Sequence, residues 1–387
     1  MAVLAASILL LRRPDAFLRP QFKAEDGVIF FNDAYELGPG SLLSPYAGYL
    51  HTVPRIVACL AMAFDPAWAP AFYAYASLLV QLSVIAVLLS PRIDLPAKPW
   101  LALALVLVPH TGEVFVNLTN IQWPLAMVLV LMLIARDPAT SGQRLSDGLA
   151  LTLCGLTGPF IVFLAPLFVV RAFQRRSPAS GLLAALALVI AGVQLVYMVR
   201  ERTALVLQGS PDPWLLLRVM SYRLYGTFWG GYGVAHFNAS FDWVAVGAVV
   251  TTVVACGAFR PGPWAGARRV LAGVGLLLIV PVGIKFVRFA LLLTSPVNGD
   301  RYFYLPHVLL AWLLILECAR AKGGGRLLAA VPLGVALAVN LSAFQVPPLT
   351  DYAWPQQVQA IREGRAFAIP INPVGWTMVS RGRNCRR

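Results

Sequence analysis

Two adjacent carboxylates, Glu25 and Asp26, lie in the stretch Lys23-Ala-Glu-Asp-Gly27, just after the first apolar segment. Charged residues make up 12% of the chain, against about 25% in an average soluble domain, so this pair is conspicuous. A carboxylate within hydrogen-bond reach of a hydroxyl can act as its general base. Neighbouring side chains point in different directions, so we expect one acid to be the base and the other to support it. We favour Asp26, because Gly27 leaves backbone room for a ligand; the alternative is two solvated loop acids or a helix cap.

Arg301, in Gly299-Asp-Arg-Tyr-Phe-Tyr-Leu-Pro306, is the second candidate for chemistry. A guanidinium stays charged and forms bidentate hydrogen bonds with phosphate, so Arg301 could stabilise negative charge that develops on a bound phosphate. We expect Tyr302 to line the same site. An Arg at the start of an apolar segment could instead be an interfacial anchor. Weaker candidates for the phosphate are Arg218, Arg223, Lys285 and Arg288.

A short polar segment at 110–120 contains Glu113, Asn117 and Asn120. Their amides and carboxylate could bind the hydroxyls of a sugar, and Glu113 could itself be the base with Asp26 supporting it. Ordinary loop polarity is the alternative. The five cysteines are scattered and show no metal-ligand spacing, so the sequence predicts neither a metal site nor a cofactor.

Apolar helices are the elements that would position these residues. Hydrophobic residues make up 59% of the chain, and several apolar runs approach the roughly 20 residues that a helix needs to cross a bilayer. The sequence therefore predicts an all-α polytopic membrane protein with about ten or eleven transmembrane helices. The expected spans are 1–11, 71–90, 100–109, 121–135, 148–170, 181–199, 244–259, 270–284, 305–316 and 327–344. Thr157-Gly-Pro159 should divide 148–170 into two short helices, because it contains helix-breaking residues.

The polar segments between the spans form the rest of the expected layout. Residues 49–64 should form a helix lying at the membrane interface, within a first outer loop at 12–70. A second long polar loop is expected at 200–243. We assign 1–344 to a transmembrane domain and 345–387 to a short polar tail.

Positive charge indicates how the chain is oriented. The net charge is +14, which in a soluble protein would suggest nucleic acid as a partner. Here the Lys and Arg residues cluster in short loops, as they do on the cytoplasmic side of membrane proteins, so no nucleic-acid partner is predicted. The first outer loop, 110–120, 200–243, the Arg301 segment and the tail then share the periplasmic face of a bacterial inner membrane, in contact with its lipids.

Three neighbouring motifs resemble those of the GT-C membrane glycosyltransferases. They are the acidic motif at Glu25-Asp26, the stretch Ser44-Pro-Tyr-Ala-Gly-Tyr-Leu-His-Thr-Val-Pro-Arg55, and an apolar interfacial helix that ends in Phe64-Asp-Pro66. The resemblance implies a multi-spanning enzyme that takes a sugar from a polyprenyl-phosphate donor on the outer face. It also implies that an acid in the first outer loop is the base.

That resemblance implies the partners as well as the fold. The acceptor would be a glycan or lipid of the cell envelope, and an in-line attack would invert the anomeric centre. His51 and Arg55 lie in the second motif and are expected to line the substrate site, with Arg55 a further candidate for the phosphate. An interfacial or hydrogen-bonded position is the alternative for His51.

Two other functions compete with sugar transfer. A transporter or flippase for a lipid-linked solute should carry charges in the middle of its spans, whereas the expected spans 71–90, 121–135 and 181–199 carry none. A polymerase or ligase that moves whole glycans would have similar Arg-rich outer loops. The early acidic motif favours transfer of a single sugar.

Overall fold

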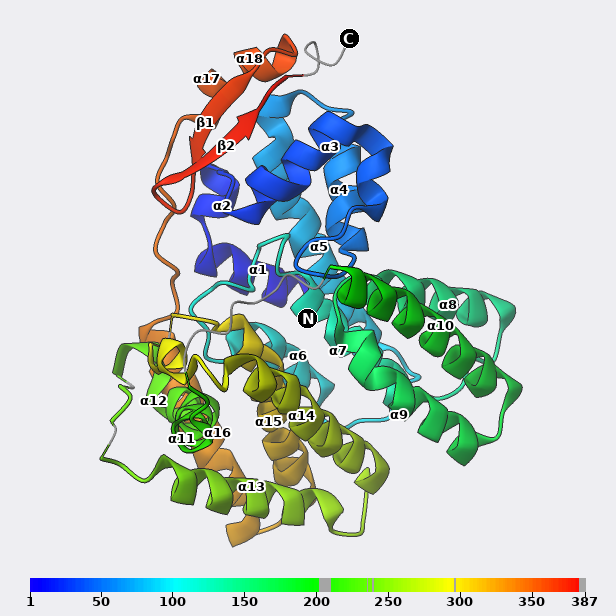
Figure 1. The fold of residues 1–387 in the computed structure, drawn as a ribbon. Helices are drawn as coiled ribbons and strands as arrows, with labels where there is room; N and C mark the ends of the chain where they lie inside the picture. The colour runs from blue at the N-terminus through cyan, green and yellow to red at the C-terminus, as the bar shows by residue number, and fades with distance from the viewer. Residues whose placement is uncertain (202–209, 235, 239, 296, 383–387) are drawn as a thin grey trace.

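The structure, a computed structural model, describes all residues except 202–209, 235, 239, 296 and 383–387. The described chain is mostly helical, with a two-stranded sheet near its C-terminus (Figure 1). Five of its helices are long and apolar enough to cross a membrane, as expected for an all-α membrane protein. They are α5 (Ala69–Leu89), α10 (Pro178–Arg200), α14 (Ala265–Phe286), α15 (Arg301–Arg320) and α16 (Gly324–Ser342).

The other expected spans form helices of 10 to 17 residues. A helix of ten residues is about 15 Å long, half of the roughly 30 Å of a bilayer core. The expected ten or eleven spans therefore compare with five helices of spanning length in the described residues. The shorter helices are α1 (Ala2–Arg12), α6 (Lys98–Leu107), α7 (Gln122–Ile134), α8 (Ser141–Gly155), α9 (Phe160–Arg175) and α13 (Trp243–Phe259).

Helix α7 lies at the centre of the helical part. Its residues from Gln122 to Leu133 are all buried, as expected for a helix that is apolar on every side. It contacts α5, α8, α9, α14 and α15. In Figure 1, α8, α9 and α10 form one group of helices, and α13 to α16 form a second group.

The expected break at Thr157-Gly-Pro159 is confirmed, because α8 ends at Gly155 and α9 begins at Phe160. Gly158 has φ = 108°, and a Cβ there would lie 2.4 Å from the Gln122 side chain, so glycine is required. The segment before α4 packs against this break, and Gly158 N–H donates to the Leu50 carbonyl at 3.1 Å. Gln194 of α10 joins the same point, accepting from Leu50 N–H at 2.9 Å and donating to the Gly158 carbonyl at 3.1 Å.

Residues 12–70 contain α2 (Asp15–Leu18), α3 (Asn32–Leu37) and α4 (Thr52–Ala61). The helix expected at 49–64 is therefore present as α4, with a shorter extent. One face of α4 is buried around Arg55 and Ala58, while Leu60 is exposed.

The prediction of a polar loop at 200–243 is wrong for most of the described residues, which are helical. It contains α11 (Pro213–Ser221), a π-helical turn at Tyr222–Gly226 and α12 (Thr227–Val234). Asp212 starts α11 by accepting the Leu215 N–H at 2.8 Å, as an N-cap residue does. Val219 and Tyr222 are fully buried, so the aromatic residues of this segment pack into the protein rather than form a loop.

The expected polar tail is folded. It contains α17 (Trp354–Gln357), α18 (Gln359–Arg362) and an antiparallel hairpin of β1 (Phe367–Ile371) and β2 (Trp376–Ser380). Figure 1 shows this hairpin beside α2 and α3. The tail shares a hydrophobic core with residues 12–70, and that core includes Phe22, Phe31, Tyr35, Trp354, Ile361, Ile369 and Met378. The tail therefore supports the segment that carries Glu25 and Asp26.

Replacing Trp354 by Ala should lower the free energy of unfolding by about 3–5 kcal/mol, the usual cost of truncating a buried aromatic side chain. Its ring lies 4.8 Å from that of Phe22, and its Nε1–H donates to the Pro66 carbonyl at 2.9 Å. The change would leave an apolar void and an unpaired carbonyl. Denaturation of the purified protein in detergent measures the effect, with the exposed Trp100 replaced by Ala as the control. Equal midpoints for the two variants would contradict the shared core.

Candidate active site

The two adjacent carboxylates point to different partners. The chain turns at Ala24, which has φ = 49° and donates its N–H to the Asn372 carbonyl of the tail. Asp26 is 7% exposed, and its Oδ1 accepts hydrogen bonds from Thr119 N–H at 2.8 Å and Thr119 Oγ1–H at 2.6 Å. Asp26 therefore anchors the segment at 110–120.

Glu25 is less buried than Asp26. Its Oε1 accepts a hydrogen bond from the Tyr46 hydroxyl at 2.9 Å. Tyr46 and Tyr49 face each other across a tight turn, in which each backbone N–H donates to the other's carbonyl, at 3.0 and 3.2 Å. The Tyr49 hydroxyl accepts from Gln122 Nε2–H at 3.3 Å. The Glu25 carboxylate thus lies beside the turn that carries Tyr46 and Tyr49.

Arg301 forms an ion pair with Glu113. Its guanidinium donates to Glu113 Oε1, and its backbone N–H donates to Oε2 at 3.2 Å. The Arg301 side chain is 37% exposed, so part of the guanidinium is accessible to a ligand. The two residues are 188 positions apart in sequence, and the fold joins the expected phosphate and sugar-binding candidates.

Electrostatic effects connect Glu25 to this ion pair. Burial, followed by the Glu25 carboxylate, raises the pKa of Tyr46, and Arg301 opposes that shift. Burial raises the pKa of Tyr49 to about 12, and both Arg301 and Glu25 act on the same hydroxyl. Because charge effects decline with distance, Glu25 and Arg301 are both within electrostatic range of these two tyrosines, and Tyr46 contacts Glu25 directly. We call Glu25, Tyr46, Tyr49, Glu113 and Arg301 the polar cluster.

Lys23 lies at the edge of the polar cluster. Burial lowers the pKa of its ammonium group, whereas the carboxylates of Glu113, Asp26 and Glu25 raise it. All three acids therefore lie within electrostatic range of one lysine. Lys23 lies two residues before Glu25, so the turn at Ala24 positions both side chains.

Tyr302 extends the site towards α14. The Arg301 guanidinium carbon lies 5.1 Å from the centre of the Tyr302 ring. Lys285 Nζ lies 4.9 Å from the centre of that ring and donates to the Tyr302 hydroxyl at 2.5 Å. Two cations thus flank one tyrosine. Lys285 was one of the weaker phosphate candidates, and the fold brings it beside the stronger one.

Asn117 and Asn120 are buried supports of the 110–120 segment. Asn117 Oδ1 accepts the Asn120 N–H at 3.0 Å, and Asn120 Nδ2–H donates to the Glu113 carbonyl at 3.0 Å. Asn117 also lines a small cavity of about 20 Å³ together with Lys23 and Asp26. These amides hold Glu113 in place by their own hydrogen bonds.

Three other expected site residues have different surroundings. Arg55 is fully buried and forms an ion pair with Asp33 at 2.6 Å, so the Asp33 carboxylate balances its charge. His51 stacks on Tyr49 at 4.6 Å behind the cluster, and burial lowers its pKa to about 3, so its ring is neutral. Arg218 of α11 donates to the Phe241 carbonyl at 3.4 Å. In the described part of the chain, no ion pair joins Arg218 to the polar cluster.

Sequence reasoning did not single out Tyr46, Tyr49 or Lys23. A signal for them was present, because all three belong to the motifs already recognised at 23–27 and 44–55. Asp300, next to Arg301, was also overlooked. It is a fully buried carboxylate, and a buried acid must have partners, so its position beside a candidate Arg was informative.

The buried Asp26 makes a testable contribution to pH dependence. Burial raises its pKa to about 6 from 3.8, although the Thr119 hydrogen bonds oppose the shift. The folded state thus holds the proton more tightly than the unfolded state. The contribution of Asp26 to the free energy of unfolding is therefore greatest below pH 4 and is lost as the pH rises through about 6. A shift of about two units corresponds to roughly 3 kcal/mol.

Asp26→Asn, which keeps the Oδ1 acceptor, should remove this dependence. Wild-type stability should fall by up to about 3 kcal/mol relative to the variant between pH 4 and pH 7. Chemical denaturation of both proteins across that range measures the difference. Parallel curves for the two proteins would show that Asp26 does not titrate in this range.

The described residues contain no group of three or more His, Cys, Asp or Glu side chains arranged to hold a metal ion. Comparison with known proteins found no matching family model, curated protein or solved structure.

Proposed function

We propose that this protein is a GT-C-type membrane glycosyltransferase that moves a sugar from a polyprenyl-phosphate donor to a hydroxyl of a cell-envelope glycan or lipid. The observation that carries the proposal is the polar cluster. It combines a hydrogen-bonded carboxylate, Glu25, with the partly exposed Arg301, and both act electrostatically on the same two tyrosines. We place the cluster on the periplasmic face of a bacterial inner membrane crossed by many helices.

In this proposal Glu25 is the general base. The acceptor oxygen attacks the anomeric carbon while Glu25 takes its proton, and the bond from that carbon to the phosphate oxygen breaks. Attack opposite the leaving group inverts the anomeric centre. Glu25 fits the role better than Asp26, because its side chain is more accessible than that of the buried Asp26.

Arg301 stabilises the leaving group. As the glycosidic bond breaks, the phosphate gains negative charge, and a fixed cation is most useful where charge develops. Lys285 donates to the hydroxyl of Tyr302 and supplies a second positive charge. Glu113 accepts from Nη1 of Arg301 and so holds the guanidinium in the position from which its exposed part binds the phosphate.

Asp26 is a positioning residue in this account. It binds Thr119 through two hydrogen bonds, and Thr119 belongs to the segment that carries Glu113. A carboxylate that accepts both donors fixes the 110–120 segment against the turn that presents Glu25. The two adjacent acids thus have separate tasks.

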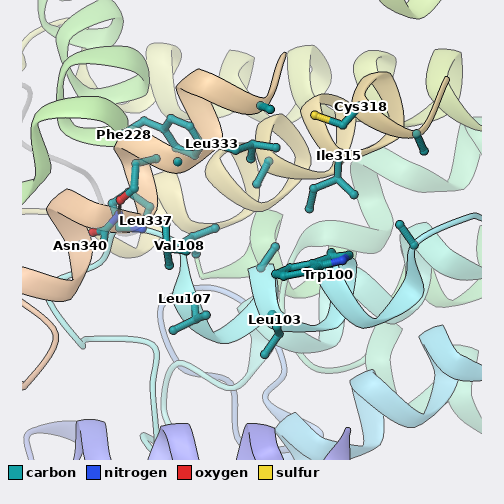
Figure 2. A pocket seen from close by; sticks show the side chains of 18 of the residues that line it. Trp100, Leu103, Leu107, Val108, Phe228, Ile315, Cys318, Leu333, Leu337 and Asn340 are labelled. Atoms are coloured by element: carbon teal, nitrogen blue, oxygen red, sulfur yellow. Dashed lines mark hydrogen bonds between the residues drawn. The ribbon is translucent and has the colours of Figure 1, made fainter. Parts of the chain in front are cut away.

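An apolar cavity of about 550 Å³ supports a lipid-linked donor. In Figure 2, Trp100 of α6 lies opposite Ile315 of α15, and Leu103 and Leu107 of α6 and Leu333 of α16 also line the cavity. One end reaches Pro109, immediately before the segment that carries Glu113. A cavity of this volume and apolar lining suits a polyprenyl chain whose phosphate lies at the end near Pro109.

Gly334→Trp should raise the KM for the polyprenyl donor several-fold and change kcat little. Gly334 lines the cavity, and a Cβ there meets no other atom within 4 Å, so the indole would fill the space intended for lipid. Gly273→Trp is the matched control: Gly273 lies on α14 outside the cavity, also with open space around it. An unchanged KM in Gly334→Trp would exclude this cavity as the lipid site.

The proposed function is tested with purified protein in liposomes that contain a radiolabelled polyprenyl-phosphate hexose or pentose and a cell-envelope fraction as acceptor. The expected result is movement of label from the lipid to the acceptor, with release of polyprenyl phosphate. Movement of intact labelled lipid between leaflets without transfer would support a transporter instead.

A further inference from the structure

A buried network of hydrogen bonds surrounds Asp300, the residue before Arg301. Asp300 is 0% exposed. Its Oδ2 accepts from Thr111 N–H at 2.6 Å and Thr111 Oγ1–H at 2.7 Å, and lies 3.0 Å from His110 Nδ1. Its Oδ1 accepts from Arg223 Nη2–H at 3.3 Å. The carboxylate thus joins the start of α15 to the 110–120 segment and to the turn after α11.

Arg223 links the same network to the chain that precedes α15. Its Nη1 donates to the carbonyls of Ser295 and Asn298, at 2.8 and 2.9 Å. The guanidinium carbon lies 4.6 Å from the centre of the Phe303 ring, and the side chain is fully buried. Arg223 therefore fixes the turn that leads into Asp300 and Arg301, and is a structural arginine rather than a free phosphate ligand.

Asp300 and Arg301 each connect the start of α15 to the 110–120 segment. Asp300 binds Thr111, and Arg301 binds Glu113, two residues further along. A buried ionic network of this kind holds one geometry, because losing a partner leaves a further charge or polar group unpaired at high cost. Movement of Thr111 away from Asp300 would therefore also move Glu113 relative to Arg301.

We propose that Asp300 is a positioning residue which, together with Arg223, sets the Arg301 guanidinium against Glu113 and so determines the affinity of Arg301 for a phosphate. The identity of the phosphate as that of a polyprenyl lipid rests on the proposed function. The positioning itself does not, because it concerns only the two segments and their shared contacts.

Thr111→Val tests the proposal with little disturbance, since it removes the hydroxyl and keeps the side-chain shape and the N–H. Asp300→Asn is the stronger variant. Arg268→Met is the control for a general loss of stability: Arg268 is equally buried and bonded to the Gly257 and Arg260 carbonyls, at the junction of α13 and α14. Melting temperature, amide hydrogen exchange of 110–120 and the Kd for polyprenyl phosphate in nanodiscs are measured for each protein.

Thr111→Val should accelerate exchange in 110–120 and raise the Kd for polyprenyl phosphate about tenfold, the typical value of one hydrogen bond to a charged group. Arg268→Met should lower the melting temperature and leave both the exchange of 110–120 and the Kd unchanged. Unchanged exchange and Kd in Thr111→Val, and in any Asp300→Asn protein that folds, would overturn the proposal.

The two proposals can fail separately. If the wild-type protein does not bind polyprenyl phosphate, the proposed function is wrong. The exchange data then decide the positioning role alone: faster exchange of 110–120 in Thr111→Val and not in Arg268→Met supports it, and equal exchange refutes it.

Discussion

Glu25→Gln should lower the rate of sugar transfer by about 10²–10⁴-fold, the usual contribution of a general base. The amide keeps the shape of the side chain and can still accept the Tyr46 hydroxyl hydrogen bond, but it cannot take a proton. Donor binding should therefore be retained, so the loss appears in kcat rather than in KM. Transfer from a labelled polyprenyl-phosphate sugar in liposomes measures both constants.

Two neighbouring acids provide the comparison for Glu25→Gln. Glu36→Gln on α3 is the control, because Glu36 accepts the Ser380 hydroxyl of the tail at 2.7 Å; transfer should stay near the wild-type rate. Asp26→Asn preserves the Thr119 acceptor and should have a smaller effect than Glu25→Gln. A large loss in Asp26→Asn with none in Glu25→Gln would reverse the assignment of the base, and wild-type rates in both would exclude this acidic motif from catalysis.

Arg301→Gln should lower kcat/KM by about 10²–10³-fold, the range found when one donor to a developing oxyanion is removed. The glutamine amide can donate a hydrogen bond but carries no charge, so the leaving phosphate loses its main electrostatic partner. Arg301→Lys should recover part of the rate, because it restores the charge without the two-pronged geometry.

Arg218→Gln is the matched control for Arg301→Gln. Both residues are arginines that the sequence offers as phosphate ligands, but Arg218 lies on α11 and donates a long hydrogen bond of 3.4 Å to the Phe241 carbonyl. Its replacement should change kcat/KM less than about twofold, since substitutions away from such sites usually have small effects. Similar losses in the two variants would mean that the phosphate site includes α11.

Local sequence patterns predicted where helices occur but not how long they are. Apolar runs such as 100–109 and 121–135 are read as spans because their composition suits lipid. In the structure the second of them is α7, which is buried by protein on all sides. Composition cannot distinguish burial in protein from burial in lipid, so the number of spans could not be obtained from it.

Two segments were misjudged because their hydrophobic partners are distant in sequence. The stretch 345–387 contains many prolines and polar residues, yet Trp354 packs on Phe22. The stretch 213–234 is rich in aromatic residues and glycine, yet Val219 and Tyr222 are buried. In both segments the structure depends on tertiary packing, which local sequence propensity does not predict.

The candidate site was predictable in part. Topology placed Glu25, Glu113 and Arg301 on one face, and the ion pair between the latter two agrees with that placement. The choice between Asp26 and Glu25 and the surroundings of Arg55 and His51 depend on side-chain direction, which adjacent positions in a motif do not reveal. Arg55, for example, is committed to Asp33, a pairing that only the folded turn creates.

Single-turnover transfer by wild type and Glu25→Gln, each saturated with the same polyprenyl-phosphate sugar, tests the central claim most directly. We predict that both proteins bind the donor with equal affinity, that wild type transfers the sugar with inversion, and that Glu25→Gln releases almost no polyprenyl phosphate. Transfer by Glu25→Gln at the wild-type rate, or none by wild type, would contradict the assignment.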